Sequence, residues 1–296
     1  MKLTNIRYIV PAVENIRART SSSGFQRTAP KLSYAKANQR WWIKLRFTSD
    51  IDLIILEKAV TGSEIRLVEL DGSFYLEDRR IPDTASMGEA RRLAEILVPQ
   101  LNGAIQFLCW PFQTATFECL IEVLENGTGR GIATCAFAVH GTSDYPDIAS
   151  FLKGDPAPIR SLLPLWKTDQ DIQDALYYIG AEGNQWANLY RAAEVVEDSV
   201  GGESMILERG WCSRSSWTRF RRTANHQEAI GLFSRHARAT TQAPSNPMTL
   251  SEARVFVAGL VRSWILFMMS RDASLETVAP QVAGGVPIYH HLGDSD

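Results

Sequence analysis

The chain has 296 residues, 45% of them hydrophobic, and a formal net charge of −2. This length and apolar content suit two ordinary domains with cores of their own, so the composition excludes a disordered chain. The near-neutral charge excludes a globally basic nucleic-acid-binding protein but leaves room for a local basic patch.

The first half of the chain is rich in strand patterns. Runs of β-branched and aromatic residues predict strands at residues 41–47 and 52–56. Ser86 and Glu89 then have the spacing of a capping box, and apolar residues follow at helical intervals. The sequence therefore predicts one helix here, kinked or stopped near Pro99.

Two hairpins are expected in the same half. The Asp-Gly pair at 71–72 favours a tight turn between strands at residues 65–70 and 73–76. Residues 116–124 and 131–139 predict the second hairpin. Its Gly-rich turn is interpreted as a loop, because no helix follows it to complete a phosphate-binding motif.

The composition changes between residues 145 and 164, which contain four prolines and precede a half without strand patterns. We therefore predict an α+β fold in two domains. A sheet-rich domain spans residues 1–150, a helical bundle spans residues 165–272, and residues 273–296 form an extended tail.

Capping residues and glycines divide the second half into five expected helices. They begin at Thr168, Asn184, Ser213 or Ser215, Gln227 and Thr249, and the first two end at Gly180 and at Gly201 with Gly202. The fourth covers residues 227–238. The last follows a capping box at residues 249–252, and its apolar stripe runs from Ala253 to Met268.

Several classes of site find little support. The cysteines Cys109, Cys119, Cys135 and Cys212 are widely spaced and form no CxxC pair, which indicates reduced thiols rather than a zinc site or a disulfide framework. His290 and His291 have no other ligand nearby at metal spacing. We expect no metal and no cofactor.

The start of the chain lacks a signal-peptide pattern, and its longest apolar run, residues 255–269, is too short for a membrane span. We expect a cytoplasmic protein without membrane contact.

Candidate chemistry is concentrated between residues 209 and 238, where every positive charge is an arginine: Arg209, Arg214, Arg219, Arg221, Arg222, Arg235 and Arg238. The planar guanidinium suits phosphate recognition, so this run predicts a patch facing RNA or another anion. A solvated, salt-bridged helix face is the alternative. His226 and His236 lie in the same region and suit proton transfer near neutral pH.

Arg221 is followed, after four intervening residues, by His226, at the expected end of a bundle helix. This arrangement resembles the HEPN domains of prokaryotic defence and toxin proteins, over roughly residues 171–269. In that family an arginine and a histidine with four to six residues between them cleave RNA without metal, and dimerisation brings two copies together. The resemblance implies that Arg221 binds phosphate and that His226 acts as acid or base on a ribose 2′-hydroxyl.

His236 is a second candidate for the catalytic histidine, because it lies closer to the loop before the last helix. Arg219, Arg222, Arg235 and Arg238 are then candidate RNA-binding residues.

Three functions remain open. The first is RNA binding or metal-independent RNA cleavage by the bundle, with the N-terminal domain as a sensor. The second is a non-catalytic scaffold, as a homodimer or as a subunit of a larger complex. The third is a hydrolase that uses Cys212 or a neighbouring serine.

Overall fold

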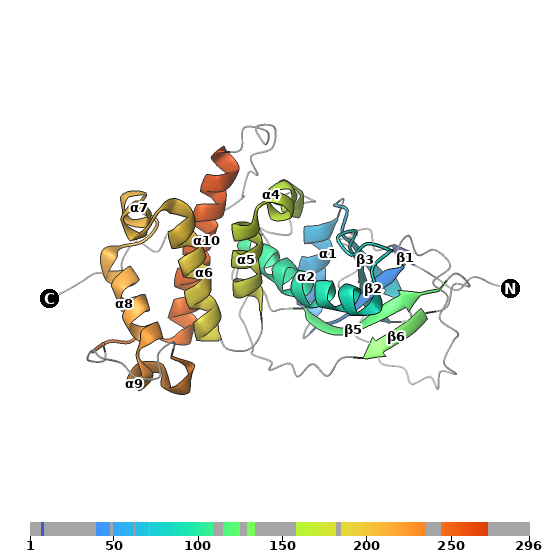
Figure 1. Ribbon diagram of the computed structural model, residues 1–296, viewed down its shortest axis with the longest axis horizontal. Helices are drawn as coiled ribbons and strands as arrows, with labels where there is room; N and C mark the ends of the chain where they lie inside the picture. Colours follow the sequence, from blue (N-terminus) through green and yellow to red (C-terminus); the bar gives the residue numbers. More distant parts are fainter. Residues whose placement is uncertain are drawn as a thin grey trace.

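The computed structural model describes residues 7–8, 40–47, 50–61, 63–70, 72–108, 115–124, 129–133, 158–181, 185–234 and 244–271. Figure 1 shows an N-terminal sheet with helices packed against it, followed by a half that is helical. The predicted α+β class and the order of its two parts are confirmed. The expected tail lies outside the described residues.

The sheet has six strands in the order β1-β3-β4-β2-β5-β6, and all of its pairings are antiparallel. In chain order the strands are β1 (Arg7–Tyr8), β2 (Trp41–Arg46), β3 (Arg66–Leu70), β4 (Ser73–Glu77), β5 (Thr116–Val123) and β6 (Gly129–Ala133). Strand β2 lies between β4 and β5, so the first tryptophan-rich run of the sequence forms the centre of the sheet.

Strand β2 buries apolar side chains on both of its faces. Trp41, Ile43 and Leu45 alternate on the face that joins the main core under the helices. Trp42, on the opposite face, packs with Tyr75 and other sheet residues in a smaller cluster. Because side chains alternate along a strand, two consecutive tryptophans fit only a strand that is buried on both sides.

Both predicted hairpins are confirmed where they are described. Strands β3 and β4 pair around Gly72, whose φ of 72° meets the positive angle that the tight turn needs. Strands β5 and β6 pair from Cys119 opposite Ala133 to Val123 opposite Gly129. The turn of the second hairpin lies outside the described residues.

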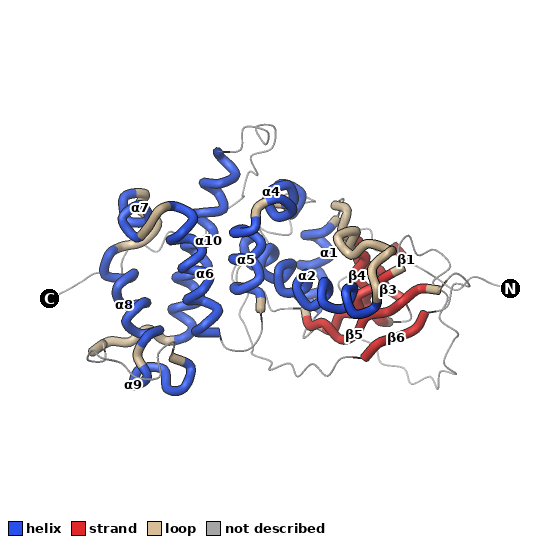
Figure 2. The backbone as a smooth tube through the Cα atoms, viewed as in Figure 1, coloured by secondary structure: helices blue, strands red, loops and turns tan. Residues whose placement is uncertain are grey.

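The predicted strand at residues 52–56 is wrong, because these residues belong to helix α1 (Asp50–Val60). Leu53, Leu56 and Val60 are buried at intervals of three and four, which is the period of a helix face. A short apolar run fits either period. Here the helix continues into Glu57 and Lys58, and it covers the inner face of the sheet (Figure 2).

Helix α2 (Met87–Leu108) begins as predicted, with the backbone N–H of Glu89 donating to the Ser86 hydroxyl at 3.3 Å. Of the two outcomes predicted at Pro99, a kink or a stop, the stop is wrong, since the helix continues for nine residues beyond the proline. Every residue from Gln100 to Phe107 is buried. Packing along this stretch outweighs the cost of a proline in the helix interior.

The second half is built from short and long helices in turn. They are η2 (Pro158–Ser161), α4 (Leu163–Thr168), α5 (Gln170–Gly180), α6 (Gln185–Val200), α7 (Glu203–Glu208), α8 (Arg214–Asn225), α9 (Gln227–Ile230), η3 (Gly231–Phe233) and α10 (Leu250–Arg271). The predicted helix ends at Gly180 and at Gly201 are confirmed, as is the cap at Ser213. Helices α4 and α7 were not predicted.

Two predictions in this half are wrong. Asp169, not Thr168, caps α5, because its carboxylate accepts the N–H of Ile172 at 3.0 Å. The helix expected over residues 227–238 ends at Ile230, since Gly231 has a φ of 65° and breaks the helical path. Residues 235–238 and the predicted cap Asn184 lie outside the described residues.

Helix α10 follows its prediction closely. Thr249 and Glu252 form the capping box, with bonds of 2.7 Å and 3.2 Å between backbone N–H groups and side chains. Six residues from Ala253 to Ile265 are buried. In the described part of the chain, α10 is the one helix long and apolar enough to cross a membrane. The core helix of a soluble protein meets the same criterion.

Helices α2 and α5 cross at very short range. A Cβ added at Gly103 would lie 2.0 Å from the carbonyl oxygen of Leu176, and one added at Gly180 would lie 2.0 Å from that of Pro99. Buried amides of α2 reinforce the contact. Gln100 donates to the Gln173 carbonyl at 3.2 Å, and Asn102 donates to the Gly180 carbonyl at 3.5 Å.

This crossing joins the two halves of the chain. The main hydrophobic cluster runs without interruption from the inner face of the sheet through α2 and α5 to α6 and α10. The predicted domain boundary at residues 145–164 lies mostly outside the described residues, so the division into two folding units stays a prediction. What the structure shows is one core that both halves share.

We predict that Gly103→Ala destabilises the protein, because the new methyl group meets the backbone of α5 rather than a flexible side chain. Overpacking of this kind costs about 1–3 kcal/mol of unfolding free energy, and occasionally more. Gly88→Ala is the matched control, since Gly88 lies in the same helix with open space around it. Thermal melting of Gly103→Ala at the wild-type temperature would contradict the close crossing.

Candidate nucleic-acid interface

Aromatic packing places α8, the helix that carries the candidates Arg219, Arg221 and Arg222. Phe220 is fully buried and stacks on Trp186 and Tyr190 of α6, with ring centroids 6.4 Å and 6.1 Å away. It also contacts Phe256 of α10 at 5.2 Å. The buried face of α8 fixes the direction of its remaining side chains, so its arginines divide into inward and outward groups.

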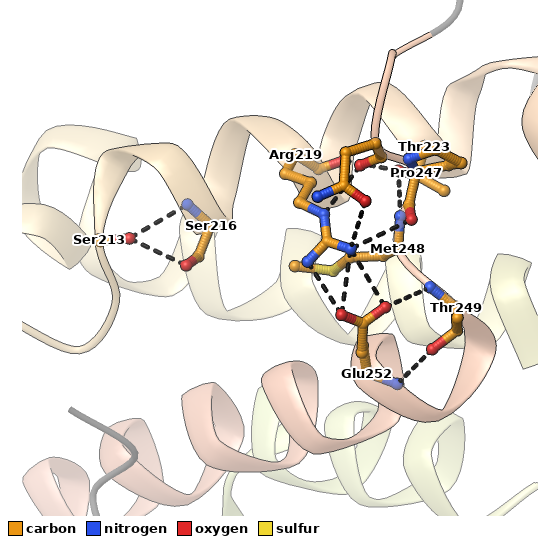
Figure 3. A network of polar contacts seen from close by, with 9 residues as sticks. Ser213, Ser216, Arg219, Thr223, Pro247, Met248, Thr249 and Glu252 are labelled. Carbon is orange, nitrogen blue, oxygen red and sulfur yellow. Dashed lines mark hydrogen bonds and ion pairs between the residues drawn. The ribbon is translucent and has the colours of Figure 1, made fainter. Parts of the chain in front are cut away.

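Arg219 holds the loop before α10 in place (Figure 3). Its guanidinium donates to the backbone carbonyls of Asn246 and Pro247 and binds both carboxylate oxygens of Glu252 at 3.0–3.2 Å. Thr223, one turn later, accepts the N–H of Met248 at 3.0 Å. The predicted RNA-binding role of Arg219 stays a prediction, and in this structure its hydrogen bonds serve the fold.

Arg221 faces α6 and α7. Its Nη1 atom lies 3.2 Å from Glu197 and 3.8 Å from Glu203, and it also bonds Tyr190. Burial lowers the pKa of this guanidinium, Tyr190 and Glu197 raise it, and the net effect is an increase. Arg221 is therefore a protonated side chain held between two carboxylates.

His226 caps the C-terminal end of α8 and is only 4% exposed. Its backbone N–H donates to the carbonyl of Thr223, and its own carbonyl accepts from the N–H groups of Ala229 and Ile230. The Arg221 guanidinium contacts Glu197, Glu203, Tyr190 and Trp217. The predicted pair is close in sequence, but the ion pairs of Arg221 are formed with carboxylates of α6 and α7.

Arg214 and Arg222 lie on the outward side of α8. Both are exposed, and together with exposed Thr218 they repeat every four residues along one stripe of the helix. The Arg214 side chain is 75% exposed and pairs with Glu203 at 3.2 Å. The remaining candidates, Arg235, His236 and Arg238, lie outside the described residues.

The alternative nucleophile is poorly activated. Burial, with a smaller contribution from Glu203, raises the pKa of Cys212 to about 11, so its thiol is protonated at neutral pH. The described residues contain no group of three or more His, Cys, Asp and Glu side chains placed to hold a metal ion.

Sequence reasoning missed three residues that surround Arg221. Glu197 and Tyr190 of α6 hold its guanidinium, and Asn225 donates to the Tyr190 hydroxyl at 3.4 Å. Tyr190 and Glu197 are seven residues apart, which is the spacing of one helix face and the one signal that could have linked them. Their partner in α8 is more than twenty residues away, so no local pattern pointed to it.

Comparisons with known proteins assign the chain to no family. No protein-family model matches the chain, and no match was found among curated proteins or solved structures. The resemblance to HEPN domains therefore stays a hypothesis that rests on the residues quoted for it.

The bond network of Glu252 predicts a pH dependence of stability. The backbone N–H of Thr249, helped by Arg219 and opposed by burial, lowers the pKa of Glu252 below its ordinary 4.5. A lowered pKa stabilises the fold above the unfolded-state value and loses that effect as pH falls through the folded-state value. We expect Glu252→Ala to cost about 1 kcal/mol near pH 7, as loss of a helix cap does.

Urea unfolding of wild type and Glu252→Ala at pH 7 and pH 3 measures this effect. The difference between the two proteins should shrink at the lower pH. Glu89→Ala is a control, because Glu89 occupies the corresponding position at the start of α2 but forms no ion pair with an arginine of the described residues. A difference for Glu252→Ala that is the same at both pH values would contradict the assignment.

Proposed function

We propose that the helical half of this protein binds RNA through the arginines of α8. The observation that carries the proposal is the exposed stripe of Arg214, Thr218 and Arg222. Its two guanidinium-bearing positions are eight residues apart, about 12 Å along the helix axis. Arginine on a regular helix face is well suited to phosphate groups, because its planar fork bonds two oxygens at once.

The ion pair of Arg214 does not stand against this role. Its side chain is 75% exposed, and exposed pairs contribute only about 0–1 kcal/mol of stability. A phosphate group can therefore replace Glu203 at small cost. Arg221 differs, because its partly buried guanidinium has two carboxylate neighbours and a tyrosine hydroxyl to give up.

The ion pairs of Arg221 and the burial of His226 favour RNA binding over RNA cleavage. The proposed ribonuclease reaction needs a histidine that reaches a ribose hydroxyl and a cation that stabilises charge on the phosphate. His226 is 4% exposed and Arg221 is paired, so cleavage at this pair requires both side chains to be released. We therefore place RNA binding first and treat cleavage as an additional activity that the experiment detects.

The test measures the binding of a labelled single-stranded RNA by fluorescence anisotropy. The measurement covers a range of salt concentrations in the presence of EDTA. Arg214→Gln/Arg222→Gln should weaken binding and reduce the slope of log K against log salt by about 1.4, since each phosphate contact on a single strand contributes about 0.7. Arg91→Gln/Arg92→Gln removes the same charge from exposed positions of α2 and is the matched control.

Three outcomes separate the alternatives. Equal loss of affinity in both double variants would show a general charge effect and contradict the interface on α8. RNA fragments with 2′,3′-cyclic phosphate ends, reduced about 10²–10⁴-fold by His226→Ala or His236→Ala, would add ribonuclease activity. Wild-type protein that binds none of a varied set of RNAs would refute the proposal.

A scaffold is the second candidate, and the outward face of α10 favours it. Val255 and Leu266 are 43% and 37% exposed, and Gly259 between them has open space above its Cα. Arg262 lies on the same face with its Nε atom buried and without a hydrogen-bond partner in the described structure. Burial lowers its pKa, so a carboxylate from a partner chain would be stabilising there.

The scaffold proposal predicts self-association through this face. Sedimentation velocity of the wild type should show a dimer or a larger species, which Val255→Glu/Leu266→Glu converts to monomer without a change in melting temperature. Met87→Glu/Ile96→Glu alters two residues of α2, each 39% exposed, and serves as control. A wild-type protein that sediments as a monomer at micromolar concentration would exclude self-association through α10.

A further inference from the structure

An aromatic and arginine cluster lies where the turn after α7 meets the C-terminal part of α10, at one end of the bundle (Figure 1). The guanidinium carbon of Arg209 lies 3.9 Å from the ring centroid of Phe267, and that of Arg271 lies 5.4 Å from the same centroid. Trp211 completes the cluster, with its ring 5.7 Å from Phe267 and 5.7 Å from Arg209. None of these residues belongs to the α8 stripe.

The turn that presents Trp211 has a fixed backbone. Gly210 has a φ of 68° and the surrounding bonds are those of a glycine-terminated helix, with the N–H of Trp211 bonded to the carbonyl of Ile206 at 3.2 Å. The N–H of Gly210 bonds to Leu207 at 3.0 Å. The Trp211 ring is therefore held against α10 before any ligand arrives, which lowers the entropy cost of binding.

Both charged side chains of the cluster are cationic. Arg209 and Arg271 are both exposed, and within the described residues neither forms an ion pair with a carboxylate. This distinguishes them from Arg214, Arg219 and Arg221, each of which contacts a glutamate. Two cations that converge on one ring repel each other, and an anion bound between them relieves that repulsion.

Cations over an aromatic ring and at the C-terminal end of a helix are also stabilising within a fold. A purely structural role is therefore the alternative. The two roles differ in what they predict, because a structural cluster contributes to melting temperature, whereas a ligand site contributes to affinity.

We infer that this cluster is a subsite for single-stranded RNA, in which a base stacks on the Trp211 ring beside Phe267 and the flanking phosphates bind Arg209 and Arg271. Aromatic rings and guanidinium planes are the surfaces on which unpaired bases stack, and arginines follow the backbone beside them. A duplex does not fit this chemistry, since its bases are stacked on each other. The inference rests on the proposed RNA-binding function and assigns a second contact to it.

The experiment measures the affinity of a labelled 12-nucleotide single-stranded RNA by anisotropy, with full-length variants whose melting temperatures are recorded alongside. Trp211→Leu should weaken binding roughly 5- to 100-fold, the range that loss of base stacking covers, and Trp211→Phe should restore most of it. Arg209→Gln/Arg271→Gln should reduce the salt slope by about 1.4. Arg91→Gln/Arg92→Gln should match the wild type.

Each outcome has a distinct meaning. If Arg214→Gln/Arg222→Gln loses affinity while the Trp211 and Arg209/Arg271 variants bind as the wild type, RNA binding stands and this subsite is wrong. If these variants melt at lower temperature with unchanged affinity, the cluster is structural and the inference is overturned. If wild-type protein binds no RNA, both the function and the subsite are refuted.

The same series of variants tests whether the cluster binds a membrane surface instead of RNA. Loss of binding to phosphatidylserine vesicles in Arg209→Gln/Arg271→Gln, with RNA affinity unchanged, would replace the RNA subsite by a lipid contact and overturn the inference. A duplex of the same sequence that binds as tightly as the single strand, and equally to the Trp211→Leu variant, would also overturn it.

Discussion

The contact between Gly103 of α2 and Leu176 of α5 is the constraint on which the rest of the structure depends. Two helices can approach this closely only where one of the two residues in contact lacks a Cβ, and Gly180 repeats the arrangement from the α5 side against Pro99. Helix α2 covers the sheet, and α5 leads into the bundle. The position of the bundle, and with it the orientation of α6 and α8, therefore follows from this crossing.

Features set by local rules were predictable from the sequence. The Asp-Gly turn before β4, the capping boxes of α2 and α10 and the Ser213 cap of α8 each depend on residues only a few positions apart. Features decided by distant contacts were not. Residues 52–56 fit both a strand and a helix, and Pro99 is tolerated because the residues after it are buried by other elements.

The arginine run illustrates the same limit at the candidate site. The composition of this run indicated where candidate site residues lie. The role of each arginine, however, depends on a partner far along the chain. Arg221 meets Glu197 24 residues away, and Arg219 meets Glu252 33 residues away. Burial of His226 likewise could not be inferred from its spacing to Arg221. Arg209 and Arg271 lie far apart in the chain, yet they converge on one ring that no motif connects to them.

The arginines thus divide by their neighbours. Arg219 ties the loop before α10 to α8 and Arg221 ties α8 to α6, whereas Arg209, Arg214, Arg222 and Arg271 are exposed. The proposal therefore predicts which part of the protein contacts RNA. RNA should contact the outward side of α8 and the end of the bundle, and it should not contact the sheet.

Ultraviolet cross-linking of a single-stranded RNA to the full-length protein, with the attached peptides identified by mass spectrometry, tests this placement most directly. The account predicts attachment at Trp211 or Phe267 and in the outward stripe of α8, with no attachment to Trp42 and Tyr75 of the sheet. Cross-links confined to the sheet, or spread equally over both halves, would contradict it.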